Sequence, residues 1–106
     1  MRATWVAVAL LGSIPALASA QDTRGAELAS ADAQLNGVYA RLIRQLRPTD
    51  AAALRTAQRA WVAFRDADCR VGWSDRRDCL IERTTERVEQ LRRATYYDAR
   101  NRRIAL

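Results

Sequence analysis

The side chains that could perform chemistry in this chain are arginines, carboxylates and two cysteines, because the sequence has no histidine and no lysine. Asp66 and Asp68 lie two residues apart, and residues at that spacing on a helix point in different directions, so they cannot act as a pair. Ser30 and Ser74 have no histidine to serve as a base. We therefore expect no catalytic residue, no enzyme activity and no cofactor.

Residues 1–20 have the pattern of a cleaved export signal. Arg2 precedes an apolar run from 3 to 11, and the small-residue sequence Ala18-Ser19-Ala20 follows a break at Pro15. The run is shorter than the roughly 20 residues that span a bilayer. We expect cleavage after Ala20 and a periplasmic or secreted protein without a transmembrane segment. A buried N-terminal helix is the alternative.

Cys69 and Cys79 are the two cysteines of the chain. In an oxidising compartment an isolated pair at this spacing predicts a disulfide, which would stabilise the fold by roughly 2–3 kcal/mol. Two thiols without histidine cannot complete a zinc site, and the spacing excludes a C-x-x-C redox pair. We expect no metal site.

Removal of the signal leaves residues 21–106, in which 17 arginines face 12 acidic residues for a net charge of +5. Basic proteins often bind nucleic acid, but an exported protein rarely meets it. An anionic envelope polymer or an acidic protein cleft is the expected partner instead.

Apolar residues at three- and four-residue steps predict three amphipathic helices. Pro48 ends the first, Thr49 or Asp50 caps the second, and Ser74 or Asp75 caps the third. We expect an all-α fold, a small three-helix antiparallel bundle over 21–95, with the disulfide between the ends of the second and third helices. A basic tail, 96–106, should fray. The apolar positions are Leu28, Ala31, Leu35, Val38, Tyr39, Leu42, Ile43 and Leu46; Leu54, Ala57, Trp61, Phe64 and Ala67 or Asp68; and Leu80, Val88 and Leu91.

Polar side chains also fall on these faces. At 100° per residue Arg65 lies on the same face as Leu54 and Trp61, and Arg87 lies on the same face as Leu80 and Leu91. A buried arginine needs a partner, so we expect Asp32, Asp68 or a main-chain carbonyl to pair with each. Such a network could fix the register of the helices or face a ligand. Its expected members are Asp32, Asn36, Gln58, Arg65, Asp68, Thr84 and Arg87.

Four segments of the chain resemble the LprI-type lysozyme-inhibitor-like domain of bacterial envelope proteins. They are Leu35-Asn36-x-x-Tyr39, Leu54-x-x-Ala57-Gln58-Arg59-x-Trp61, Phe64-Arg65-Asp66-x-x-Cys69 and Cys79-Leu80-x-x-x-Thr84-x-x-Arg87-x-x-x-Leu91, within about 29–92. The resemblance implies a helical, disulfide-bonded, exported protein that inhibits lysozyme. Members commonly carry a second cysteine pair, which this sequence lacks.

Inhibition of lysozyme needs a surface that fills a saccharide cleft and meets its two carboxylates. The exposed candidates, on or beside the disulfide-closed loop, are Arg70, Trp73, Arg76 and Arg77. The net positive charge would slow association with a basic animal lysozyme, whereas a less basic endogenous muramidase would avoid this repulsion. The alternative function is an envelope-binding module whose arginines, between Arg92 and Arg103, contact anionic cell-wall or lipid groups.

Overall fold

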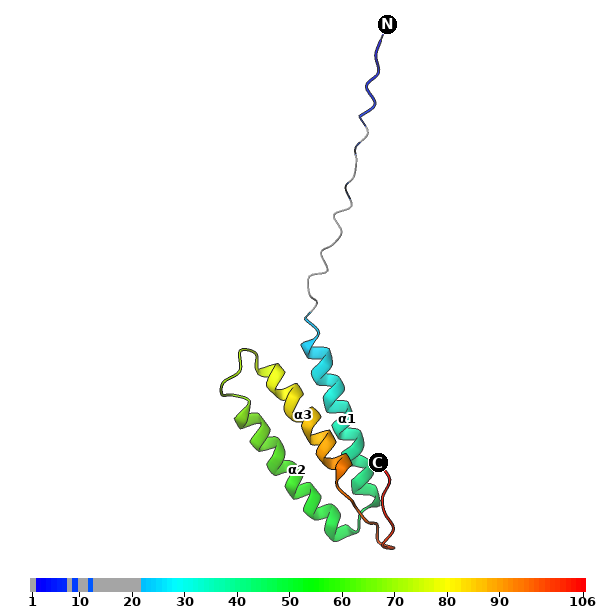
Figure 1. The fold of residues 1–106 in the computed structure, drawn as a ribbon, viewed down its shortest axis with the longest axis vertical. Coiled ribbons are helices and arrows are strands. Elements are labelled where there is room, and N and C mark those ends of the chain that lie inside the picture. Colours follow the sequence, from blue (N-terminus) through cyan, green and yellow to red (C-terminus); the bar gives the residue numbers. More distant parts are fainter. Residues whose placement is uncertain (1, 8, 10–11, 13–21) are drawn as a thin grey trace.

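Three helices make up most of the structure, a computed structural model that describes residues 2–7, 9, 12 and 22–106 (Figure 1). They are α1 (Arg24–Gln45), α2 (Pro48–Asp68) and α3 (Arg76–Arg93). Within these residues no strand forms, and the β-structure consists of two isolated bridges, Leu46–Asp98 and Tyr97–Arg103. The all-α prediction is confirmed. The predicted cleavage site after Ala20 lies outside the described residues.

Two caps show how local sequence sets the helix ends. Asp75 caps α3 as expected, since its side chain accepts a hydrogen bond from the backbone N–H of Arg77. The start of α2 differs from the prediction, because Pro48 is its first residue and Arg47 occupies the cap position. Proline is favoured there because its fixed φ suits a helix and its missing N–H is not needed.

The main core forms where α1 packs on α3 and the C-terminal segment. In Figure 1 these two helices lie side by side and run in the same direction, and Arg24 of α1 contacts Asp78 of α3 near their starts, with Nε and Oδ1 2.8 Å apart. On α1 and on α3 the core residues lie three or four positions apart, which places them on one face of each helix. They are Leu35, Val38, Leu42, Leu46, Ala51, Val88, Leu91 and Ile104.

Helix α2 runs in the opposite direction in Figure 1, and fewer of its residues are buried than in α1 or α3. Ala51 is its one buried residue, whereas Leu54 and Trp61 are half-buried against the core. The expectation that Phe64 joins the core is wrong, since this side chain is 60% exposed. Because Trp61 is only half-buried, it lies at the margin of the core and not at its centre.

The C-terminal segment corrects another expectation. Residues 96–106 do not fray as a tail, because Ile104 is buried in the main core and its backbone N–H donates to the carbonyl of Tyr96 at 2.9 Å. Asp98 accepts hydrogen bonds from two backbone N–H groups, those of Arg100 and Arg102, and this turns the segment back on itself. A single isoleucine can dock a polar segment because its burial removes apolar surface from water.

Among the described residues, we find no helix with the length and apolar character needed to cross a membrane.

Candidate functional site

A disulfide-closed loop joins α2 to α3. Cys69 follows the last residue of α2, Cys79 lies in the first turn of α3, and their Cα atoms are 5.4 Å apart. The predicted disulfide is confirmed. Both cysteines are buried with Leu80, and Leu28 of α1 packs against them. Gly72 lies in this loop with φ +80°, a backbone conformation that glycine adopts without a steric penalty.

The four predicted binding residues have different surroundings. Trp73 is 37% exposed, and Arg70 is exposed on the same loop, where the neighbouring Val71 is 74% exposed. Arg76 is exposed and donates to the backbone carbonyl of Asp66 at 3.3 Å. Arg77 is half-buried and forms ion pairs with carboxylates at the base of the loop. The exposed surface of the loop is formed by Arg70, Val71 and Trp73.

An ion-pair cluster at the base of the loop involves Asp75 and Arg77. The Nη2 atom of Arg77 lies 2.9 Å from Asp75 and 2.9 Å from Asp22, so one guanidinium connects the loop to the residues preceding α1. Hydrogen bonds from the side chain and backbone of Arg77 lower the pKa of Asp75 from 3.8 to about 2. The folded state therefore favours the ionised form of Asp75.

Asp75→Asn should lower the melting temperature near neutral pH, and the difference from the unsubstituted protein should shrink toward about pH 2. The folded pKa of Asp75 is depressed, so its contribution to stability is complete above the ordinary pKa of 3.8 and is lost as the pH falls toward about 2. Thermal melts of both proteins across this pH range measure the effect. A difference that stays constant down to about pH 2 would contradict it.

Beyond Ala51 and Leu54, which pack on the main core, a layer of polar side chains connects α2 to the other two helices. Arg65, with a side chain 16% exposed, pairs with Asp32 of α1 at 3.5 Å and donates to the hydroxyl of Thr84 at 3.1 Å. The guanidinium carbons of Arg65 and Arg87 lie 5.3 and 5.8 Å from the centre of the Trp61 ring, within the range of cation–π contacts.

The remaining members of the expected network are arranged as follows. The expectation that Arg87 pairs with Asp32, Asp68 or a main-chain carbonyl is wrong, because its Nε donates to the side-chain oxygen of Gln58 at 3.0 Å and so joins α3 to α2. Asp68 instead contacts Arg83, a residue outside the predicted set, at 2.9 Å. Asn36 is exposed on α1, and its side chain makes no hydrogen bond with Arg65 or Arg87.

The polar layer leaves a groove of about 500 Å³ between α1 and α2. The floor and walls combine apolar, amide and charged side chains from both helices. The lining residues are Asp32, Leu35, Asn36, Tyr39, Arg55, Gln58, Arg59, Trp61, Val62 and Arg65. Sequence reasoning did not assign Arg55, Arg59 or Val62 to a site, although their three- and four-residue spacing places them on one face of α2.

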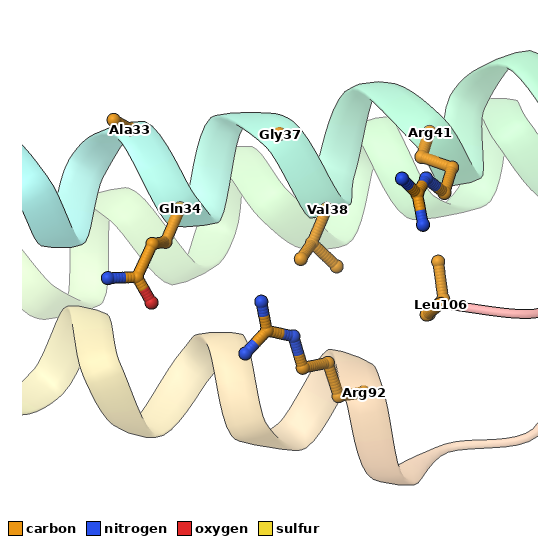
Figure 2. Close-up of a pocket in the computed structure, with 7 residues that line it drawn as sticks. All are labelled: Ala33, Gln34, Gly37, Val38, Arg41, Arg92 and Leu106. Carbon is orange, nitrogen blue, oxygen red and sulfur yellow. The ribbon is translucent and has the colours of Figure 1, made fainter.

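A smaller hollow of about 280 Å³ lies between α1 and α3. Figure 2 shows Arg41 of α1 and Arg92 of α3 directed into it, with Arg41 near Leu106 and the guanidinium of Arg92 near Gln34 and Val38. Within the described part of the chain neither arginine has a carboxylate within 4.0 Å. The hollow therefore has a positive rim.

Comparison with protein families identifies the chain. The model of the lysozyme inhibitor LprI family matches residues 15–91, which is more than half of the sequence. The chain belongs to the LprI lysozyme-inhibitor family. The resemblance of the four sequence segments is thereby confirmed. No curated protein and no solved structure matches the chain.

The segments that resemble the LprI family supply both the disulfide and the polar layer. Cys69 and Cys79 close the loop, while Gln58, Trp61 and Arg65 belong to the layer and also face the groove. Asp68 lies close to the two cysteine sulfurs, but these atoms are bonded to each other and are not available as metal ligands. The geometry therefore provides two candidate binding surfaces, the loop and the groove.

Proposed function

We propose that this chain is an exported, non-catalytic protein that binds a lysozyme or related muramidase and inhibits it through the disulfide-closed loop. Membership of the LprI family supports a function of the lysozyme-inhibitor type. The observation that carries the proposal is that this loop is covalently closed and presents Val71 and Trp73 to solvent. The signal sequence over 1–20, with release as a free periplasmic or secreted protein, is part of the same proposal.

The loop has the features expected of a surface that inserts into a cleft. Its ends are joined by the disulfide, so little conformational entropy is lost when a partner orders it further. Tryptophan is among the residues that most often dominate binding energy at interfaces. The apolar surface of Val71 and Trp73 can therefore anchor the loop in a saccharide cleft.

The adjacent arginine supplies complementary charge. Glycoside hydrolases flank the scissile bond with two carboxyl groups. A guanidinium can bind a carboxylate through two parallel hydrogen bonds. Arg70 is exposed beside Val71 and is the residue of the loop that we assign to this contact. Blocking the carboxylates and filling the cleft would stop catalysis without chemistry by the inhibitor.

Arg70→Ala combined with Trp73→Ala should weaken inhibition of muramidase activity about tenfold or more, because it removes the charged contact and the aromatic anchor together. Inhibition constants of the purified protein are measured on a panel of lysozymes. Members of the panel with low net positive charge should be inhibited best, since the net charge of the chain repels basic partners.

A matched control variant carries Arg44→Ala and Tyr97→Ala, which remove an exposed arginine and an aromatic residue that is 45% exposed, both outside the loop. This control should inhibit as well as the unsubstituted protein. Equal inhibition by the loop variant and the control, or no inhibition of any lysozyme by the unsubstituted protein, would contradict the proposal.

A second candidate function is contact with anionic cell-wall or lipid groups, and it is favoured by the positive rim of the hollow between α1 and α3 (Figure 2). Arg103 extends this surface, because it lines an adjoining hollow with Arg92. Binding through exposed charges is screened by salt, whereas a cleft-filling contact keeps much of its affinity. Measuring both inhibition of the lysozyme panel and binding to anionic lipid vesicles, each at low and moderate salt, separates the two functions.

A further inference from the structure

The groove between α1 and α2 is separate from the loop, and what it does is independent of the proposed function. Arg65 and Gln58 line it, and their hydrogen bonds with Thr84 and Arg87 connect α2 to α3 beside the groove. The ion pair between Arg65 and Asp32 links the two helices that form its walls. Its volume of about 500 Å³ is in the range of small-molecule sites.

The lining of the groove includes apolar side chains and uncharged hydrogen-bonding groups beside its charged residues. Trp61 and Val62 supply apolar surface, and Tyr39 adds an aromatic ring with a hydroxyl. Gln58 uses its carbonyl oxygen to accept from Arg87, which leaves its amide nitrogen as a donor. Asn36 is exposed on the facing helix, and no hydrogen bond of its side chain to another described residue is present.

The charges of the groove favour an anionic ligand. The carboxylate of Asp32 is already paired with Arg65. Arg55 and Arg59 line the α2 side, and within the described part of the chain neither has a carboxylate within 4.0 Å. Arg59 has one weak polar contact, with the hydroxyl of Thr56 at 3.5 Å. Two guanidinium groups are therefore available to a ligand.

We propose that the α1–α2 groove binds a short saccharide that carries a carboxylate and acetamido groups. Indole and phenol rings pack against the apolar C–H faces of sugar rings, and the amides of Asn36 and Gln58 can pair with hydroxyl and acetamido groups. Arg55 and Arg59 bind the carboxylate through charge-assisted hydrogen bonds. A groove with this volume accommodates a ligand of one or two sugar rings.

The test compares two disaccharides that differ in one carboxylate. N-acetylglucosaminyl-N-acetylmuramic acid and N,N′-diacetylchitobiose share the acetamido groups, and only the first carries a lactyl carboxylate. Isothermal titration of the purified protein should give a dissociation constant about tenfold lower for the acid. In NMR spectra, the chemical shift of the Trp61 indole N–H should change on addition of either sugar.

Arg55→Gln combined with Arg59→Gln should abolish the preference for the acid and leave the weaker binding of the neutral disaccharide unchanged. A matched control, Arg44→Gln with Arg93→Gln, removes two exposed arginines outside the groove and should retain the preference. Circular dichroism verifies that both variants fold.

Three results would overturn the proposal. They are equal affinity for the two disaccharides, a preference that survives in the Arg55→Gln/Arg59→Gln variant, and tighter binding of an oligoglutamate peptide that requires the same two arginines. The last result would assign the groove to an acidic protein segment instead. No lysozyme is present in this experiment, so failure of the proposed inhibition leaves its outcome unaffected.

Discussion

Leu42→Ala is expected to lower the free energy of unfolding by about 3 kcal/mol, because it removes a side chain from the centre of the core. Leu42 is 0% exposed and belongs to the cluster that joins α1, α3 and Ile104 of the C-terminal segment. The shortened side chain leaves a cavity that its close-packed neighbours cannot fill completely. Urea titration followed by circular dichroism measures the loss.

Leu54→Ala is the comparison variant for this prediction. Leu54 is half-buried on α2 and packs on the edge of the same cluster, so the same truncation should cost about 1 kcal/mol. A loss at Leu54 equal to that at Leu42 would mean that α2 is packed as tightly as the α1–α3 pair.

Loss of the disulfide is the second large effect. Cys69→Ala combined with Cys79→Ala should lower the free energy of unfolding by roughly 2–3 kcal/mol, because the unfolded chain regains the entropy of a loop closed over ten residues. Helicity at low temperature should remain, since the main core lies in a different cluster from the cysteines. Thermal melts followed by circular dichroism measure both properties.

Reduction provides an independent control for the same bond. Dithiothreitol should lower the melting temperature of the unsubstituted protein and leave the double alanine variant unchanged. If the reductant shifted both proteins equally, the effect would not arise from this disulfide. The double variant should also inhibit more weakly, because an open loop must be ordered on binding.

Stability and proposed binding are concentrated in different parts of the fold. The buried residues come mainly from α1 and α3, whereas α2 contributes one buried residue, Ala51. Both candidate surfaces involve α2, since the loop follows its last residue and the groove lies along its length. Substitutions at exposed positions of α2 should therefore change binding more readily than stability.

Several particular residues show where sequence reasoning was sufficient. Leu35, Leu42, Val88 and Leu91 were expected on apolar faces from their spacing and are buried. Asp75 was expected as a cap, and it accepts the hydrogen bond of that position. These properties depend on residues within one helix or one turn, so periodicity and local hydrogen bonding determine them.

Other residues show where sequence reasoning was not sufficient. Phe64 fits the apolar pattern of α2 but is exposed and belongs to neither core cluster. Ile104 is isolated among arginines and has no periodic pattern, yet it is buried against α1 and α3. Arg77 was expected as a free binding residue but pairs with Asp75 and with Asp22, which is distant in sequence.

The amino-acid sequence by itself determined the three helices, the pairing of the two cysteines and membership of the LprI family, because each depends on residue types and spacing along the chain. The tertiary structure alone decided which helices share the core, where the C-terminal segment docks and which arginines of the described residues have no carboxylate within 4.0 Å. These features depend on contacts between residues far apart in sequence, and a one-dimensional pattern does not specify which faces meet. The groove beside Trp61 is such a feature, since it forms only when α1 and α2 are held apart.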